Sequence, residues 1–291
     1  MKSAPNRYRH RGFTLVELIM VIVIMGAIGG MVSVFMKSPI DAYFDSARRA
    51  ALTDVADTTV RRMARDIQRA LPNSIRNPSD ATNQCIEFIP TKTGGRYRAA
   101  SDGSVVPVVD FLDFTTADSS FNMLGLNSTL PVDQRIVGTD VIAVYNLGIS
   151  GSDAYTGVNT AVVSSVEGTP TLVANETKIT LTAGKKFPLE SGSSRFQVIP
   201  NDEKIVSFVC PTTIPGNLVR NSNYAYPASI DATTACPTGG AILAKNVTCT
   251  LNYSGSDLQR NALVSMVLSV TDSSSGEAVR LQHEVHVSNT P

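Results

Sequence analysis

The sequence predicts an α+β fold in which one long N-terminal helix packs on a β-rich globular head. Three observations predict it. An uncharged apolar run covers residues 18–36, a stripe at helical spacing continues to residue 71, and short β-branched segments follow from residue 73. The chain has 291 residues, a length that is sufficient for a long helix and one sizeable head. It contains four cysteines.

The apolar run has the length of a single membrane span, about 20 residues for a hydrocarbon core of ~30 Å. Glu17 stands at its N-terminal end, and no basic residue follows before Lys37. A charge at the bilayer centre costs roughly 2.5–3.5 kcal/mol on insertion scales, so intramembrane acids usually have a partner. We therefore expect the partner of Glu17 to come from outside this helix.

The residues around the run predict its orientation. Lys2, Arg7, Arg9 and Arg11 precede it, so the positive-inside rule puts the N-terminus in the cytoplasm and everything after Lys37 in the periplasm. An ordinary secretory signal is the alternative. It would place a small-residue cleavage site after the apolar region, and residues 34–37 offer none. We expect the span to be retained.

Residues 11–18 read Arg-Gly-Phe-Thr-Leu-Val-Glu-Leu. This pattern resembles the class III leader of type IV pilins and of type II secretion pseudopilins. The resemblance implies that a prepilin peptidase cuts after Gly12 and methylates the new terminus at Phe13. It also implies that Glu17 pairs with the terminal amine of a neighbouring subunit during assembly.

The same resemblance implies a localisation and a set of partners. The subunit is expected in the inner membrane, in contact with lipid, and then in the pilus fibre or at its tip. Other major and minor pilins and the inner-membrane assembly platform are the implied partners. The large head, residues 61–67 and residues 284–289 resemble minor pilins related to pseudopilin J and minor pilin W, including those of the mannose-sensitive haemagglutinin (MSHA) type of pilus. A minor pseudopilin of a secretion system is the alternative, and no local residue separates the two.

Four segments are expected along the chain: a cleaved leader over 1–12, an assembly helix over 13–36, an amphipathic helix over 37–72 and the head over 73–291. The helix is expected to end at Leu71, because a residue before proline is driven out of the helical region. Its stripe at steps of three and four comprises Phe44, Arg48, Leu52, Val55, Thr59, Met63, Ile67 and Leu71.

Three glycines interrupt the apolar run at Gly26, Gly29 and Gly30. Related pilins often have a helix-kinking proline near the position of Val34, whereas the nearest proline here is Pro39. Each glycine weakens a helix by about 1 kcal/mol relative to alanine. The glycines therefore predict either local melting on assembly or close packing through Gly-x-x-x-Gly. A third reading is that glycine is simply common in membrane helices.

The head is predicted to consist of short strands and to end in a hairpin. It is either one β-rich domain or one domain with a long insertion around 115–200. The final hairpin is expected from the alternation over 264–270 and 279–287, separated by turn residues 272–276. Earlier strands are expected at 105–114, 135–147, 178–182, 195–199, 204–210 and 247–253.

The four cysteines, Cys85, Cys210, Cys236 and Cys249, form an even set without Cys-x-x-Cys spacing. This disfavours a zinc ribbon and favours two disulfides in an oxidising compartment. Four cysteines allow three pairings. The C-terminal disulfide loop of many pilins implies Cys236 with Cys249, which leaves Cys85 for Cys210.

The sequence contains no recognisable catalytic pattern, and no cofactor or metal site is expected. His283 and His286 lie three apart on a predicted strand, so they face opposite sides and cannot share one ion. A signal-anchored periplasmic enzyme or binding module would need a constellation of residues that is not found. A DNA-uptake pilin would need a basic patch with aromatic residues. Residues 73–291 hold 14 basic and 19 acidic groups, so nucleic acid is not expected as a partner of the head.

Overall fold

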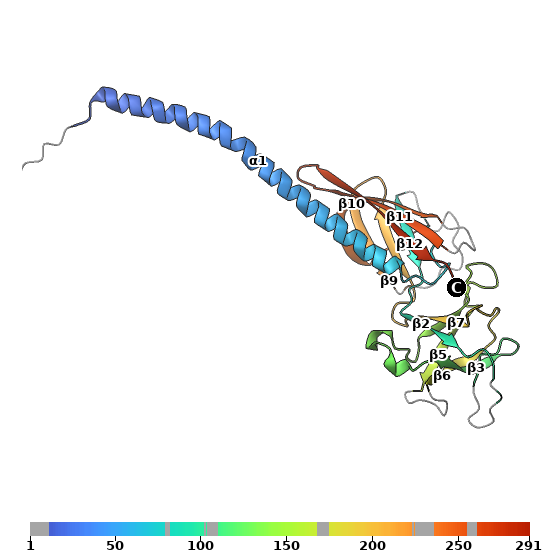
Figure 1. Cartoon of the computed structure of the whole chain (residues 1–291). Coiled ribbons are helices and arrows are strands. Elements are labelled where there is room, and N and C mark those ends of the chain that lie inside the picture. Colours follow the sequence, from blue (N-terminus) through green and yellow to red (C-terminus); the bar gives the residue numbers. More distant parts are fainter. Residues whose placement is uncertain are drawn as a thin grey trace, which may run out of the picture. The chain divides into compact units, whose positions relative to one another are not determined.

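The structure of the chain is a computed structural model that describes residues 12–78, 82–101, 103, 110–167, 175–222, 224, 236–254 and 261–291. The chain divides into two compact units, Met1–Ala51 and Leu52–Pro291. The described part of the first unit is almost entirely helical. The second contains the end of that helix, a six-stranded sheet and a closed barrel, and it forms the head (Figure 1).

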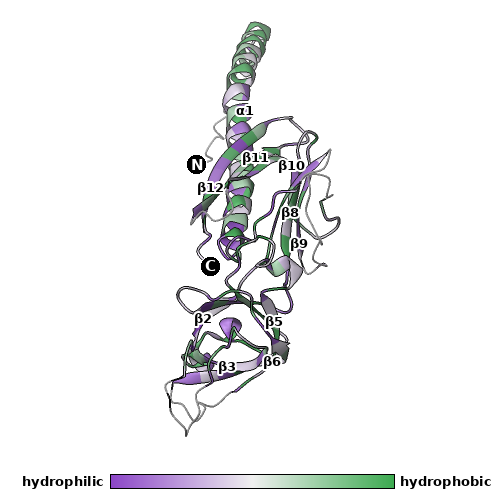
Figure 2. Ribbon diagram, turned by 90° about the vertical axis from the view of Figure 1, so that its right-hand side faces the viewer, coloured by the Kyte–Doolittle hydropathy of each residue, from purple (hydrophilic) through white to green (hydrophobic). Residues whose placement is uncertain are grey.

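The helix, α1, covers Leu15–Ile67 without interruption. In the first unit, residues 15–47 are all exposed, and Figure 2 shows mainly hydrophobic colours toward the N-terminal end of α1. The helix continues through Gly26, Gly29 and Gly30, where an added Cβ would have open space within 4 Å, and through Pro39. The expected melting or close packing at the three glycines stays a prediction.

The end of α1 packs on the sheet within the head. Ala56, Val60, Met63 and Ile67 are buried against strand residues of one large hydrophobic core. Residues at steps of three and four share one face of a helix. Met63 and Ile67 belong to the predicted stripe, whereas Ala56 and Val60 were not predicted. Two predicted stripe members differ, because Phe44 and Val55 are exposed. The buried face is completed by alanines at 56 and 64, whose small side chains allow close approach to the sheet.

The helix ends at Ile67, four residues before the predicted end at Leu71. The backbone N–H groups of Arg69 and Ala70 bond to carbonyls only three residues back, at Asp66 and Ile67. The Leu71 N–H then donates to the carbonyl of Ile89 at 2.7 Å. A backbone hydrogen bond to Ile89, which follows β1, thus replaces the last helical turn. The helix ends before it reaches Pro72, so the proline is not what ends it.

All neighbouring strands of the sheet are antiparallel, in the order β1-β8-β9-β10-β11-β12. Along β11, Val264, Met266, Leu268 and Val270 are buried and alternate with residues that are partly exposed. This two-residue period is that of a sheet with one face on the core. The predicted closing hairpin is confirmed. The strands are β1 (Asn83–Phe88), β8 (Val206–Pro211), β9 (Gly216–Ser222), β10 (Ala241–Ser254), β11 (Asn261–Thr271) and β12 (Ala278–Ser288).

The chain leaves the sheet after β1, forms a closed six-stranded barrel, and returns as β8. The head is therefore one sheet with a long insertion, whose strands begin at residue 93 and not near 115. Phe121, Phe187 and Phe196 fill the barrel. Gly95 of β2 lies opposite Phe196 of β7. An added Cβ at Gly95 would lie 2.7 Å from the Phe196 ring, so glycine leaves the space that this ring occupies. In spatial order the strands are β2 (Thr93–Tyr97), β3 (Asp118–Leu124), β6 (Glu176–Lys185), β5 (Thr160–Val166), β4 (Val141–Val144) and β7 (Arg195–Ile199); the short helices are η1 (Asn127–Thr129), η2 (Val132–Gln134) and η3 (Ala154–Thr156).

Two predicted strands are corrected. Of 105–114, residues 105–109 lie outside the described part of the chain, and 110–114 are not a strand. There the Asp113 carboxylate accepts from the Thr115 N–H at 2.7 Å, which favours a turn. Of 135–147, only Val141–Val144 is a strand. The Asp140 carboxylate accepts from the Val137 N–H at 2.7 Å, and this turn occupies the residues before the strand.

The predicted disulfide pairing is also wrong, although all four cysteines are paired. The bonds are Cys85–Cys236 and Cys210–Cys249, with Cα–Cα distances of 5.9 and 5.8 Å. Because β10 is one extended strand, Cys249 lies roughly 26 Å along it from its first residue, at ~3.3 Å per residue, and Cys236 precedes that residue. Strand β9 begins at Gly216, opposite Val247. The part of β10 that follows Val247 has no β9 residue between it and β8. Cys249 lies in this part and bonds to Cys210 of β8.

Candidate functional site

The candidate site lies at the beginning of α1. The Thr14 hydroxyl accepts from the Glu17 N–H at 3.3 Å, and the Thr14 carbonyl accepts from the Leu18 N–H at 3.2 Å. A threonine followed three residues later by glutamate forms the start of a capping box. Thr14 therefore fixes where the helix begins and leaves Phe13 outside it, exposed.

Glu17 lies in the first helical turn, where a carboxylate interacts favourably with the positive end of the helix dipole. In the part of the chain that the structure describes, no basic side chain forms an ion pair with it. The dipole alone is worth typically 0.3–1 kcal/mol, less than the roughly 2.5–3.5 kcal/mol cost at a bilayer centre. A partner for Glu17 from outside this helix stays a prediction.

Gly12 and Phe13, the predicted cleavage and methylation residues, are both exposed. An added Cβ at Gly12 would meet nothing within 4 Å, so the chain itself places no steric demand for glycine there. The basic residues Lys2, Arg7, Arg9 and Arg11 lie outside the described residues. If glycine is required at position 12, the requirement must come from an enzyme that binds this segment.

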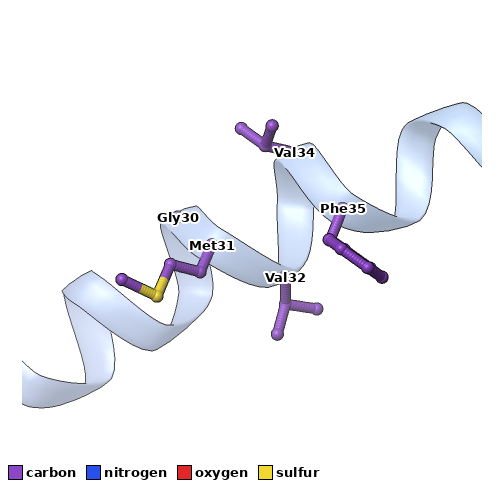
Figure 3. A pocket seen from close by; sticks show the side chains of 5 residues that line it. All are labelled: Gly30, Met31, Val32, Val34 and Phe35. Carbon is purple, nitrogen blue, oxygen red and sulfur yellow. The ribbon is translucent and has the colours of Figure 1, made fainter.

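A hollow on α1 is lined by Gly30, Met31, Val32, Val34 and Phe35. Figure 3 shows that all five come from one helix, with Val34 pointing to one side and Val32 and Phe35 to the other. Among the described residues only this helix lines the hollow, and none of the lining side chains is polar. Its chemistry suits lipid tails or another apolar helix, and it offers nothing to position a polar substrate.

Comparison with known proteins agrees with this geometry. Residues 7–33 match the family model described as the prokaryotic N-terminal methylation motif. The chain carries a type IV pilin-like signal. Searches of the curated proteins and of the solved structures found no match.

The motif and the helix together support a type IV pilin-like or pseudopilin-like protein. The motif implies processing by a prepilin peptidase and assembly with other pilins, and it points to a structural protein more than to an enzyme. The apolar part of α1 is long enough to cross a membrane and fits an inner-membrane anchor.

The head contains a buried polar cluster that sequence reasoning missed. Glu87 on β1 is 2% exposed and accepts from the Tyr224 hydroxyl at 2.6 Å. Arg76 pairs with Asp153 at 3.1 Å and lies 3.4 Å from the centre of the Tyr155 ring. Burial raises the pKa of Glu87, against the lowering effects of the Tyr224 hydrogen bond and of Arg76. These residues are far apart in sequence, so no local pattern could have revealed them.

The histidines lie as predicted, on alternate faces of β12, with His283 partly buried and His286 exposed. Within the described segments, no group of three or more His, Cys, Asp or Glu side chains is placed to hold a metal ion.

Proposed function

We propose that this chain is a minor pilin that primes assembly of a type IV pilus or sits at its tip. The observation that carries the proposal is the methylation motif, which leads directly into an apolar helix surface that the rest of the described chain leaves exposed. Such a surface needs either lipid or other helices around it. A subunit that passes from the membrane into a helical bundle meets both needs in turn.

Glu17 supplies the assembly interaction in this proposal. Cleavage after Gly12 creates a cationic amine at Phe13, and the Glu17 carboxylate of a neighbouring subunit pairs with it. The two groups are four residues apart, so the pairing sets an axial stagger of about 6 Å at ~1.5 Å per residue. In a low-dielectric bundle this attraction is stronger than in water. Thr14 assists by holding Phe13 clear of the helix.

The barrel insertion favours a minor subunit. A shaft packs many copies of one head side by side, so each large insertion must be accommodated at every repeat. A subunit at the tip meets this demand only once. The resemblance of the large head to minor pilins of the MSHA type supports a pilus, and a minor pseudopilus subunit of a secretion system stays the alternative. In this arrangement the N-terminus starts in the cytoplasm, and the assembly platform receives the subunit from the inner membrane.

The test compares wild type with Glu17→Leu and Glu17→Gln in cells that lack the native chain. Both variants should be processed and inserted normally, and the heads should unfold at the wild-type temperature. Both should lower incorporation into sheared pili at least tenfold, because neither side chain carries the negative charge that forms the ion pair with the Phe13 amine. Co-purification with other minor pilins, quantified by mass spectrometry, provides the measurement.

Gly12→Val serves as the processing control, because it should retain the 12-residue leader and so lack the mature Phe13 terminus. A mature terminus in this variant contradicts the cleavage assignment. Wild-type incorporation of both Glu17 variants contradicts the pairing. Loss of a secreted substrate with normal pilus number in a deletion strain would instead indicate a secretion pseudopilus.

A further inference from the structure

A hollow of about 390 Å³ lies within the head. Its walls come from both the barrel and the sheet side. Tyr145 and Leu147 follow β4, and Gly192 and Ser193 belong to the segment before β7. Figures 1 and 2 show the C-terminal end of the chain between the sheet and the barrel. The complete lining is Asn73, Tyr145, Leu147, Gly192, Ser193, Asn289, Thr290 and Pro291.

Side-chain amides hold this hollow in shape. The Asn73 amide donates to the carbonyls of Asn146 at 2.9 Å and Asn289 at 3.1 Å. The Asn289 amide donates to the Tyr253 hydroxyl at 3.2 Å. Asn146, which is 0% exposed, donates to the carbonyl of Pro72 at 2.7 Å. The lining segments that follow α1, β4 and β12 are thus fixed before any ligand arrives, which lowers the entropic cost of binding.

The backbone of the lining is strained. Tyr145 has φ 48° and Asn73 has φ 58°. Asparagine tolerates this left-handed region, but for a bulky residue such as tyrosine it is a true outlier. Strain of about 1–3 kcal/mol per residue persists where the surroundings impose it, and such residues cluster at ligand sites. Gly148 takes part, since an added Cβ there would lie 2.5 Å from the Asn73 carbonyl oxygen.

The chemistry of the lining limits what can bind. None of the lining side chains carries a charge, so an anion would find no counter-charge among them. In the described part of the chain no hydrogen bond engages the hydroxyls of Tyr145, Ser193 and Thr290 or the Oδ1 of Asn73. Hydroxyls that both donate and accept, beside an aromatic residue and Leu147, suit a ligand with hydroxyl groups around an apolar ring face.

We propose that this hollow, the junction pocket, binds a neutral saccharide of one or two rings. Its volume is near the lower end of the usual range for small-molecule sites, and sites between structural parts are common. The proposal concerns the head alone and does not depend on the filament role. It holds for a pilin, for a pseudopilin or for a subunit that never leaves the membrane.

The experiment uses the full chain, purified in lauryldimethylamine oxide because maltoside and glucoside detergents would occupy the site. Saturation-transfer NMR is recorded with glucose, galactose, mannose, N-acetylglucosamine and lactose. N-acetylneuraminic acid and the peptide Gly-Ser-Gly serve as charged and peptide comparators. Transfer is expected to at least one neutral sugar and to neither comparator, followed by a titration of that sugar.

Ser193→Trp is the blocking variant, because Ser193 is exposed and its replacement fills the junction pocket without touching a core. Ser128→Trp is the matched control, an exposed serine on the barrel away from the pocket. Ser193→Trp should abolish transfer, and Ser128→Trp should leave it intact. Tyr145→Phe should weaken binding about 2- to 10-fold, as expected for one lost hydrogen bond.

Thermal unfolding of each variant shows whether the head remains folded. Absence of transfer from wild type to all five sugars overturns the proposal, as does transfer that survives in a folded Ser193→Trp variant. Preferential transfer to the peptide or to the acidic sugar overturns the assignment of ligand class.

Discussion

Two segments of the same helix behave differently. Over residues 18–36 apolar side chains surround α1 and all are exposed. Over residues 52–67 a buried stripe that includes Met63 and Ile67 packs in the head, whereas Val55 and most of the charged residues are exposed. Met31 and Met63 show the contrast most simply, being 74% and 1% exposed. The later segment finds its partner in its own sheet, whereas the earlier one finds none in the described chain.

The two segments contribute to stability in different surroundings. Burial against the sheet contributes to folding of the head, so residues 52–67 should respond to changes that affect a protein core. An all-round apolar surface contributes only when lipid or another helix covers it. Substitutions over 18–36 should therefore change insertion or assembly while the head folds as before.

The largest expected effect comes from shortening the buried Met63, with the exposed Met31 as its control. Met63→Ala should lower the free energy of unfolding of the head by about 2–5 kcal/mol, because it leaves a cavity in the core. Met31→Ala should leave it unchanged. Denaturant unfolding of the full chain in micelles, followed by near-UV circular dichroism, measures both. An equal loss in the two variants would show that the segments are not distinct.

Two arginines that pair with residues 52–67 should differ in their contribution to the free energy of unfolding, by less than the two methionines do. Arg220 on β9 pairs with Asp66 of α1 at 2.8 Å and with Glu203 at 2.7 Å. Arg220→Met removes both pairs and should cost about 1–2 kcal/mol, less than a fully buried pair because the carboxylates stay partly exposed. Its control is Arg61→Met, which removes an exposed pair with Asp57 on the solvent face. That change should not be measurable by urea unfolding, and a loss matching that of Arg220→Met would argue against the assignment of the faces.

The smallest effect concerns pH. Burial raises the pKa of Glu87 in the folded head above its ordinary value of 4.5. The folded state then holds a proton that the unfolded state releases, so stability is fully present below about pH 4.5 and is lost as pH rises through the folded pKa. The slope for one proton is at most ~1.4 kcal/mol per pH unit.

Glu87→Gln should remove this part of the pH dependence, and Glu284→Gln on the exposed face of β12 should retain it. Urea unfolding at a series of pH values provides the comparison. A pH profile that Glu87→Gln leaves unaltered would show that Glu87 does not titrate in this range. Since α1 residues 18–36 hold no ionisable group, pH acts on the head alone in this comparison.

Local patterns in the sequence predicted the local features of the fold. The leader motif at residues 11–18, the long helix and the closing hairpin all depend on residues close together in the chain. Features that depend on distant residues were missed or wrong. The cysteines pair differently from the prediction because of where β9 begins. The barrel is closed by β2 pairing with β7, about 100 residues later. The helix ends early for the same reason, because Ile89 captures the Leu71 N–H.

The junction pocket shows the same limit. Tyr145 and Asn73 are ordinary residues in the sequence, and nothing around them predicts a left-handed backbone. Only tertiary hydrogen bonds, such as those from Asn73 to Asn146 and Asn289, bring the lining together. Glu17 is the opposite case, since one charge before an uncharged run is visible at once.

The two disulfides have a mechanical consequence for the barrel. A pull on the barrel enters the sheet at the adjacent ends of β1 and β8, where Phe88 is opposite Val206. This direction of load peels the strand pair open one residue at a time. Peeling of β1 passes Phe88, Glu87 and Ile86 and then reaches Cys85, which is bonded to Cys236, while Cys210 anchors β8 to β10. Beyond three residue pairs the tension passes to the covalent Cys85–Cys236 bond, which limits how far a load on the barrel can open the strand pair.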